Sequence, residues 1–399
     1  MTNDDGGGVR HRSWSYFAVS LLIAGCAAGD GADVPTQGGA RHFERAVRLE
    51  DTSETSANVS IGDIDGDGHL DVVLVKGRHW PLVDVLLMGD GTGSFAEARP
   101  LGSASDRSYS GVLVDMDGDG DLDVVVSNDD PDPKVVYLND GQGQFEVGST
   151  FGEPEWSTRH VSVTDLNGDG LPDAILANRT GDSSGFSYIC FGAGEGRFAD
   201  PCTGFAKESA TTITAADLNG DGFPDLAVPH RDGGQSHIYI NDGSGGFQER
   251  TPFGPPDAEI RSARAADFDG DGALDLAVID EVRGPAILRG LAGGGFGQPT
   301  PLGAGDDTPY AVSIADVDGD GRTDIIVGFV EARPVVFFNE GEDRFTPVTF
   351  GDGEGVAYGF AVDDIDEDGF MDIAMARSGA PNMLYFGAPA ADTAALPSS

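Results

Sequence analysis

One nine-residue acidic pattern, D-x-[DN]-x-D-G-x-x-D, recurs seven times in this chain of 399 residues. Successive copies start 52, 50, 52, 50, 49 and 48 residues apart, and a glycine-rich stretch ending in phenylalanine lies 19 or 20 residues before each copy. The copies start at Asp63, Asp115, Asp165, Asp217, Asp267, Asp316 and Asp364, and the phenylalanines are Phe43, Phe95, Phe145, Phe198, Phe247, Phe296 and Phe345. Two landmarks that keep the same phase indicate one structural unit of about 50 residues, repeated along the chain.

Each unit contains four short apolar runs. In the second unit, we expect strands at residues 111–114, 122–126, 135–138 and from Phe145 onward. The runs are rich in Val and bounded by Gly, Asn and Asp, which is typical of strands joined by tight turns. An all-β unit of four antiparallel strands, repeated seven times, predicts a seven-bladed β-propeller. A parallel β-helix with calcium loops is the rival fold, but its repeat of about nine residues does not fit.

The two ends of the repeat array complement each other. After the seventh acidic copy, segments 372–376 and 382–386 supply a second and a third strand, but no fourth strand follows. The missing strand lies at the other end, where segment 43–49 begins with the phenylalanine landmark. We therefore predict that the first and last strands share one blade, which closes the ring and removes open sheet edges. The propeller is expected to span residues 42–388, followed by a disordered tail at 389–399.

The acidic copies have the composition of calcium loops. Calcium takes six to eight hard oxygen ligands, and a tight loop can offer carboxylates at positions 1, 3, 5 and 9 with a backbone carbonyl at position 7. Magnesium prefers strict octahedral geometry and zinc prefers nitrogen and sulfur, so both fit less well. Up to seven structural Ca²⁺ ions are expected, because full coordination leaves no open position for catalysis.

The predicted ligands form seven sets. They are Asp63, Asp65, Asp67, His69 and Asp71; Asp115, Asp117, Asp119, Asp121 and Asp123; Asp165, Asn167, Asp169, Leu171 and Asp173; Asp217, Asn219, Asp221, Phe223 and Asp225; Asp267, Asp269, Asp271, Ala273 and Asp275; Asp316, Asp318, Asp320, Arg322 and Asp324; and Asp364, Asp366, Asp368, Phe370 and Asp372. In each set the fourth residue contributes its carbonyl. These loops account for much of the acidic excess of the chain, which has 68 Asp and Glu against 24 Lys and Arg.

With these loops and spacing, the sequence resembles the FG-GAP/VCBS repeat family, the calcium-loop propellers similar to the integrin α-subunit head. The likeness covers roughly residues 42–388. It implies that each ion sits in the hairpin between the first two strands of a blade and stiffens that blade. Asn167 and Asn219 at position 3 are variants that the family tolerates, whereas Glu367 replaces the glycine at position 4 of the seventh loop. The added loops and partner subunit of the integrin head do not carry over.

The first 26 residues have the organisation of a secretory signal. Arg10 and Arg12 precede the apolar stretch 14–23, which is too short for a membrane span, and small residues lead to Cys26. Segment 22–26 resembles a bacterial lipobox, in which Cys26 is lipidated, and Ala27 would not retain such a protein at the inner membrane. We expect an exported cell-envelope lipoprotein, at the outer membrane, or a secreted protein. Residues 27–41 indicate a flexible tether.

Cys190 and Cys202 remain after processing, in a compartment that permits disulfides. They flank one predicted hairpin turn. In simple register Cys190 would face a residue near 198, so a bond to Cys202 requires a bulge or a bend, and the sequence leaves both the bonded and the free state open.

The loops opposite the acidic turns form a candidate ligand face. This face is expected to carry Arg78, Trp80, Tyr109, Trp156, Arg179, Arg231, Tyr310 and Tyr358. Recurrent arginine and aromatic residues on a propeller face are suited to a glycan or an acidic partner. The alternative is that the arginines pair with neighbouring carboxylates and limit self-repulsion in a chain of net charge −44. That charge argues against nucleic acid and against anionic membranes, apart from a lipid anchor.

Catalytic motifs are nearly absent. Residues 181–185 match G-x-S-x-G, but the motif falls between two predicted strands and not between a strand and a helix as a nucleophile elbow requires. We therefore predict a monomeric, calcium-stabilised, non-enzymatic binding or adhesion module for a protein or glycan partner. The alternative is a polysaccharide lyase or hydrolase with its site on the loop face, which would gain support if Arg, His, Tyr and Asp from several blades converged in one pocket.

Overall fold

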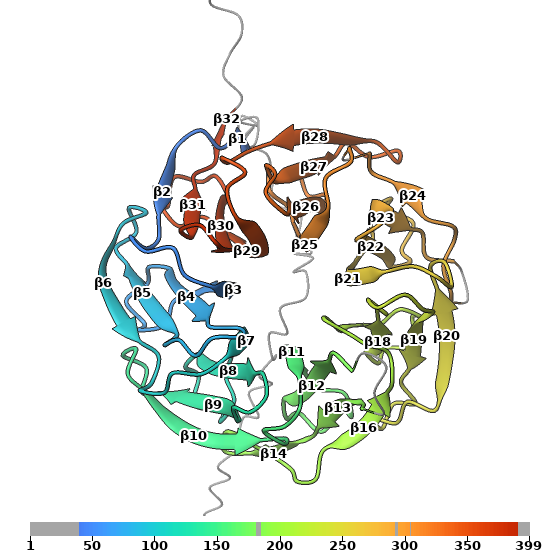
Figure 1. Cartoon of the computed structure of the whole chain (residues 1–399), viewed down its shortest axis with the longest axis horizontal. Helices are drawn as coiled ribbons and strands as arrows, with labels where there is room; N and C mark the ends of the chain where they lie inside the picture. Colours follow the sequence, from blue (N-terminus) through green and yellow to red (C-terminus); the bar gives the residue numbers. More distant parts are fainter. Residues whose placement is uncertain (1–39, 181–184, 292–293, 304, 390–399) are drawn as a thin grey trace, which may run out of the picture. The chain divides into compact units, whose positions relative to one another are not determined.

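A computed structural model describes residues 40–180, 185–291, 294–303 and 305–389, all within one compact unit, Thr36–Ser399. The predicted signal segment, Cys26, most of the tether, the first four residues (181–184) of the G-x-S-x-G motif and the tail from 390 lie outside these residues. The described part contains only strands, so it holds no helix long and apolar enough to cross a membrane. Seven four-stranded antiparallel sheets surround a central axis, which confirms the predicted seven-bladed propeller (Figure 1).

The sheets follow the repeat, with the first strand of each innermost. Blades 1 to 3 comprise β3 (Ser56–Gly62), β4 (Asp71–Lys76), β5 (Val85–Gly89) and β6 (Phe95–Pro100); β7 (Ser108–Val114), β8 (Asp123–Asn128), β9 (Lys134–Asn139) and β10 (Phe145–Phe151); and β11 (Thr158–Thr164), β12 (Asp173–Asn178), β13 (Ser187–Cys190) and β16 (Thr203–Ala206). Blades 4 and 5 comprise β17 (Thr214–Ala216), β18 (Asp225–Val228), β19 (Ser236–Ile240) and β20 (Glu249–Phe253); and β21 (Ile260–Ala266), β22 (Asp275–Asp280), β23 (Gly284–Leu288) and β24 (Thr300–Pro301).

The last two blades show how the ring closes. Blade 6 comprises β25 (Pro309–Ala315), β26 (Asp324–Phe329), β27 (Val335–Asn339) and β28 (Phe345–Thr349). Blade 7 comprises β29 (Val356–Asp363), β30 (Asp372–Ser378), β31 (Met383–Tyr385) and, from the other end of the chain, β2 (Ala46–Arg48). Val47 pairs with Leu384, so the predicted closure by an N-terminal strand is present.

Two short pairings were not expected. β1 (Ala40–His42) pairs with β32 (Ala388–Pro389), so a strand includes the last two residues of segment 27–41, all of which we predicted to be flexible tether. The third blade carries an extra hairpin of β14 (Gly192–Gly194) and β15 (Arg197–Phe198). The Phe198 landmark therefore does not begin the outer strand of that blade, which starts at Thr203 instead.

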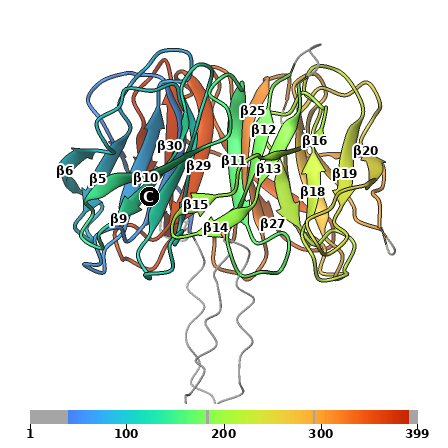
Figure 2. The same ribbon diagram turned by 90° about the horizontal axis from the view of Figure 1, so that it is seen from below.

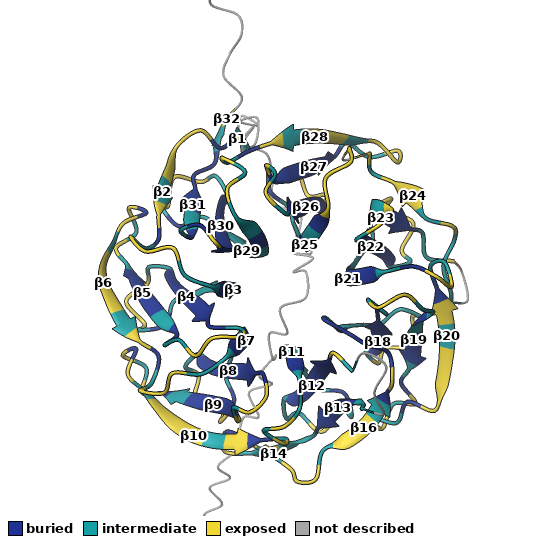
Figure 3. Cartoon of the chain, in the orientation of Figure 1, coloured by how far each residue is buried: buried dark blue, intermediate teal, exposed yellow. Residues whose placement is uncertain are grey.

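The second strand of each blade is buried on both sides. In β4, Val72 and Leu74 pack toward blade 7, whereas Val73 and Val75 pack toward blade 2. Successive side chains of a strand point to opposite faces, so such a strand needs a continuous apolar run rather than an alternating one. Burial is densest in the middle strands, and exposed residues gather on the outer strands (Figure 3).

The strands of each blade run along the axis, so each turn belongs to one of the two ends of the ring (Figure 2). The acidic loops lie at one end with the turns between third and fourth strands. Asn139, at the start of such a turn, donates from Nδ2 to the carbonyl of Ile64 in the acidic loop of the neighbouring blade over 2.7 Å. The loops between second and third strands, and the connections between blades, lie at the other end. We call this second end the loop-rich face.

Candidate functional site

The acidic loops gather carboxylates into clusters. In five loops, three aspartates offer oxygens that all lie within 4.8 Å of one another. These clusters are Asp63, Asp65 and Asp71; Asp115, Asp117 and Asp123; Asp267, Asp269 and Asp271; Asp316, Asp318 and Asp320; and Asp364, Asp366 and Asp372. In the third and fourth loops Asn167 and Asn219 stand at position 3, so fewer carboxylates can gather there.

The loop backbone curls around the first aspartate. Gly118 N and Gly120 N donate to the two carboxylate oxygens of Asp115, over 2.7 and 3.2 Å. Both glycines have positive φ, of 86° and 100°, which a residue with a Cβ adopts only with strain. Glu367, the one departure from glycine at position 4, adopts the same left-handed conformation with φ of 55°, and the seventh loop keeps its cluster.

The last aspartate of each loop also accepts hydrogen bonds from the backbone of its blade. Asp71 is buried, and its two oxygens accept from Ile64 N at 2.9 Å and from Gly89 N at 2.7 Å. Burial raises the pKa of the equivalent Asp123, Asp173 and Asp225 to about 6 and that of Asp324 and Asp372 to about 7. A nearby cation would favour the ionised form of these carboxyls.

The donor set fits calcium. Carboxylate oxygens of Asp63, Asp65, Asp225 and Asp366 are buried without a hydrogen-bond partner among the described residues. A buried carboxylate oxygen without a partner is costly, and a hard cation would satisfy it. Carboxylate-only clusters of this kind are suited to calcium rather than to zinc.

Arginines occupy part of the ligand set in the last three loops, which the sequence did not predict. Arg41 and Arg45, from the N-terminal segment, lie 2.6 Å from Asp318 and 2.5 Å from Asp366. Arg289 pairs with Asp275 in the fifth loop. In the first four loops, no ion pair reaches a predicted ligand side chain within the described ranges.

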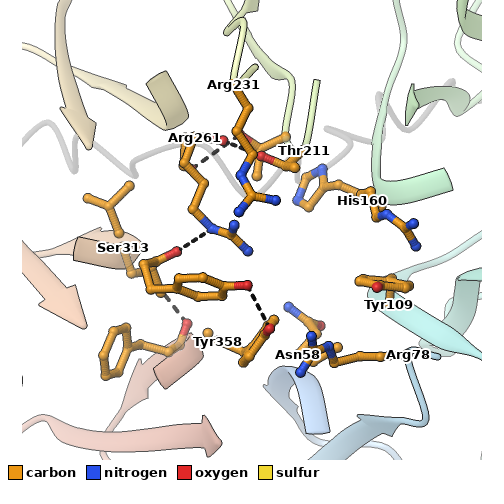
Figure 4. Close-up of a pocket in the computed structure, with 18 of the residues that line it drawn as sticks. Asn58, Arg78, Tyr109, His160, Thr211, Arg231, Arg261, Ser313 and Tyr358 are labelled. Atoms are coloured by element: carbon orange, nitrogen blue, oxygen red, sulfur yellow. Dashed lines mark hydrogen bonds between the residues drawn. The ribbon is translucent and has the colours of Figure 1, made fainter. Parts of the chain in front are cut away.

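A pocket of about 190 Å³ opens on the axis at the loop-rich face, lined by residues from all seven blades (Figure 4). Its wall follows a rule that the sequence analysis did not find: the residue six positions before the first Asp of each acidic loop lines the pocket in every blade. These residues are Ala57, Tyr109, Arg159, Thr211, Arg261, Tyr310 and Tyr358.

A local irregularity turns these side chains inward. In six inner strands, the pairing register shifts across this residue, for example between Ser108 and Ser110 around Tyr109. Such bulges re-aim a side chain that regular pairing would direct toward a neighbouring blade. In blade 4, β17 starts after Thr211, so the residue precedes the strand.

Several residues of the predicted ligand face meet in this pocket. Arg78, Arg179 and Arg231 reach it from loops that follow the second strands, beside the inward-turned Tyr109, Tyr310 and Tyr358. The pocket also holds Asn58, His79, His160 and Arg264, which the sequence analysis did not assign to a ligand site. The two tryptophans do not line it: Trp80 is exposed elsewhere, and Trp156 stacks on Tyr188 with ring centroids 3.6 Å apart.

Arginines cover the tyrosine rings. The guanidinium carbons of Arg261, Arg78 and Arg159 lie 3.4, 3.9 and 4.3 Å from the ring centroids of Tyr310, Tyr358 and Tyr109, respectively. The hydroxyls of Tyr310 and Tyr358 are 2.7 Å apart. Although burial raises the pKa of Tyr310, Arg261 and this hydrogen bond lower it on balance.

The electrostatic character of the pocket is basic. Burial and the charge of Arg264 lower the pKa of His160 to about 3, so this ring is neutral at ordinary pH. Burial, Arg159 and Arg78 also lower the pKa of His79. The positive charge of the pocket is therefore carried by its arginines.

Part of this arginine set is paired, as the alternative interpretation expected. Arg179 lies 2.9 Å from Asp232, and Arg231 and Arg261 share Glu281 at 2.8 and 3.0 Å. Outside the pocket, Arg377 pairs with Asp352 at 2.5 Å. The pairing is incomplete, because Arg78 and Arg264 contact no carboxylate within the described part of the chain.

Cys190 and Cys202 form a disulfide that spans 12 residues. The β14–β15 hairpin between them provides the bend that direct bonding requires, so that Ile189 pairs with Thr203 rather than with a residue near 198.

Comparison with protein families decides the identity of the repeat. A model described as FG-GAP-like repeat matches six overlapping segments: residues 63–126, 115–176, 165–228, 217–278, 267–327 and 316–375. The chain belongs to the FG-GAP-like repeat family. No curated protein sequence matches it significantly.

Among solved structures, this FG-GAP-like protein is similar to BBS1N in complex with ARL6DN. One such crystal, soaked with mercury, matches with a TM-score of 0.57 and 14% identity over 87% of this chain and 97% of that chain. A second, soaked with lead, matches with a TM-score of 0.56 and 15% identity over 86% and 96%. At such identity the likeness establishes the propeller fold and nothing finer.

Proposed function

We propose that this protein is an exported, calcium-stabilised, non-enzymatic binding module of the bacterial cell envelope, which presents its loop-rich face to a glycan or protein partner. Its anchor would be lipid on Cys26, at the outer membrane, unless the protein is secreted. The observation that carries the proposal is the polar pocket on that face, because a concave site with converging polar groups is the usual form of a ligand site.

Calcium is assigned a structural role in this proposal. The clustered aspartates, with buried oxygens that find no partner within the described residues, support a divalent cation in the loops. The ion would tie the hairpin between the first two strands of a blade, far from the loop-rich face. The loop residues themselves hold the backbone turn, as Asp115 does for its two glycines.

Export and partner binding rest on separate observations. The Cys190–Cys202 disulfide is typical of an oxidising compartment, which agrees with the secretory signal expected at the N-terminus. A protein partner is supported by BBS1N, a propeller solved in complex with another chain, ARL6DN. The pairing of β2 with β31 closes the ring within one blade and leaves β31 without an open edge, which supports a monomer.

The proposal is tested by exposing the processed protein, in calcium, to a glycan array and to intact bacterial cells with cross-linking. We expect saturable binding that is lost in a loop-face variant combining Trp80→Ala, Val282→Ser and Arg78→Gln. Trp80 and Val282 are 69% and 68% exposed. The matched control is Arg344→Gln at the opposite end of the ring. Absence of any partner, or equal loss in the control, would contradict the proposal.

The pocket also favours a second candidate function, a polysaccharide lyase. Arg, His and Tyr from several blades converge there, which are three of the four residue types that the enzyme alternative expected; Asp, the fourth, is absent from the described lining. A hydrolase with two catalytic carboxylates is disfavoured, because no Asp or Glu belongs to the described lining. Incubation with acidic polysaccharides, followed by ultraviolet absorbance of unsaturated products, distinguishes a lyase from a binding module.

A further inference from the structure

The axial pocket concentrates positive charge in a strongly acidic protein. Six arginines line it, namely Arg78, Arg159, Arg179, Arg231, Arg261 and Arg264. Three carboxylates balance part of that charge: Asp129, Asp232 and Glu281. Six positive minus three negative charges leave a formal +3 in a chain whose net charge is −44. Charge of this sign, held at the end of the axis, favours an anionic ligand.

Unused donors point to a bound group rather than to internal pairing alone. Arg78 donates to Ser378 Oγ at 2.9 Å, but its Nε is buried without a partner among the described residues. Arg264 donates at 2.9 Å to the carbonyl of Ala263 and meets no carboxylate in the described ranges. A planar guanidinium with free donors matches the two oxygens of a carboxylate.

Neutral polar groups surround the arginines. Thr212, Ser262 and Asn58 line the same pocket, and the hydroxyls of Tyr310 and Tyr358 are 2.7 Å apart within it. Figure 4 labels Asn58 and Tyr358 among these residues. These groups can donate to and accept from sugar hydroxyls, which a bare inorganic anion lacks. The pocket volume of about 190 Å³ exceeds several-fold the roughly 30 Å³ that a water molecule takes in the liquid.

We propose that this axial pocket binds one acidic sugar residue, a uronate, with its carboxylate on the arginines and its hydroxyls on the Tyr, Thr, Ser and Asn side chains. The inference rests on the proposed function, because it names the ligand class of the same loop-rich face. The source is either a free sugar acid or the end of an acidic polysaccharide, which share this chemistry.

The test is a calorimetric titration of the processed protein in calcium with D-galacturonate, with galacturonate trisaccharide, with D-galactose and with inorganic phosphate. Galactose is the matched neutral sugar, because it carries a hydroxymethyl group where galacturonate carries a carboxylate. We expect galacturonate or its trisaccharide to bind at least about 10-fold more tightly than galactose and phosphate, with the trisaccharide favoured if the source is a polymer.

Two pocket variants locate the site. Arg78→Gln and Arg231→Gln should each weaken uronate binding by about 10-fold or more, with unchanged melting temperature. The control Arg344→Gln, whose side chain is 67% exposed at the other end of the ring, should bind as the parent does. Tyr109→Phe, which removes only a hydroxyl, provides a milder second probe if either arginine variant melts early.

The outcomes separate this inference from the proposed function. The inference would be overturned if the protein bound no uronate, or if it bound galactose or phosphate as tightly as uronate. It would also be overturned if the pocket variants had no effect on uronate binding. If an array or cell-surface partner still binds in those cases, the proposed function stands. Binding of free galacturonate but not of its trisaccharide, without any array or cell-surface partner, would support the pocket and overturn the proposed function. Conversion of the trisaccharide to unsaturated products would also support the ligand class.

Discussion

Arg41 donates from Nη2 to Oδ2 of Asp318 over 2.6 Å, so a guanidinium of the N-terminal segment contacts a loop carboxylate of the sixth blade. Arg41 also contacts Glu340 at 2.5 Å. The N-terminal segment thus brings a positive charge to a predicted calcium ligand. Calcium in that loop must displace or share this contact, whereas the second loop has no such competitor among the described residues.

Removal of this competitor should strengthen calcium binding. In Arg41→Gln, we expect the sixth loop to bind calcium several-fold more tightly, because a partly exposed ion pair contributes up to about 1 kcal/mol. Calorimetric titration of the calcium-free protein with calcium measures the change as a lower Kd for the weakest class of calcium sites. Arg344→Gln serves as the arginine control, and an unchanged or weaker isotherm in Arg41→Gln would refute the competition.

Chelation should destabilise the ring. An ion at 100 times its Kd stabilises the folded state by about 2.7 kcal/mol per site, so EGTA should lower Tm by several degrees. Asp117→Ala should bind one ion fewer and lose part of this response. Asp257→Ala, with its side chain 78% exposed outside the loops, should behave as the parent. A protein whose melting is indifferent to EGTA would contradict structural calcium.

Asp84 should make stability depend on pH. Burial raises its pKa to about 7, while Lys76 N and Ser108 Oγ donate to its oxygens. Because the folded pKa lies above the unfolded value of 3.8, its contribution is fully present below that value and is lost as pH rises toward about 7. Asp84→Asn should therefore gain stability over the parent, on the order of 1 kcal/mol or more, between about pH 5 and about pH 8.

Urea unfolding at the two pH values, in saturating calcium, measures that difference. Asp257→Asn provides an exposed control with no expected change. A gap between Asp84→Asn and the parent that is constant with pH would show that Asp84 does not titrate in this range.

The disulfide should stabilise the third blade. It closes a segment of 12 residues. A loop of about this length is worth roughly 3 kcal/mol through restriction of the unfolded chain. We expect the double variant Cys190→Ala/Cys202→Ala to unfold at lower urea concentration than the parent. Dithiothreitol should lower the midpoint of the parent but not that of the variant, and an equal effect on both would rule out the bond as the cause.

Ring closure should depend on β2. Deletion of residues 1–49 removes β2 and the buried Phe43 and Leu49, and it leaves β31 as an open edge. Such an edge favours aggregation, so we expect a lower Tm and higher oligomers by size exclusion with light scattering. Deletion of residues 1–39 is the matched control and should remain a stable monomer. Equal behaviour of both deletions would show that β2 does not close the ring.

The repeat phase was sufficient to predict the blades, because strand length, turn chemistry and burial all follow local sequence. It also predicted the closing strand, since Phe43 lies in phase with the other landmarks. The prediction was weakest where a blade departs from the pattern. The β14–β15 hairpin displaces the outer strand of the third blade, and Phe198 alone gave no sign of that insertion.

The candidate site was only partly predictable. Arg78, Tyr109 and Tyr310 lie at the loop-rich face as predicted, but the inward direction of Tyr109 and Tyr310 depends on bulges in the inner strands. A bulge arises from how two strands pair, which single residues do not reveal. Comparison of the seven repeats six positions before the first Asp would have shown the unusual charge of Arg159 and Arg261. The contact of Arg41 with Asp318 joins residues 277 positions apart, beyond any local pattern.

Between β2 and β31 the ring is closed by hydrogen bonds rather than by a chain connection, and this junction lies inside the sheet of blade 7 instead of between two blades. A continuous chain segment therefore connects every pair of neighbouring blades, including blades 7 and 1, which β2 and β3 join. A circular permutant whose chain begins at β11 and ends at β10 should therefore form the same seven sheets. The order of repeats in the gene and the order of blades in space are thus separable properties of this fold.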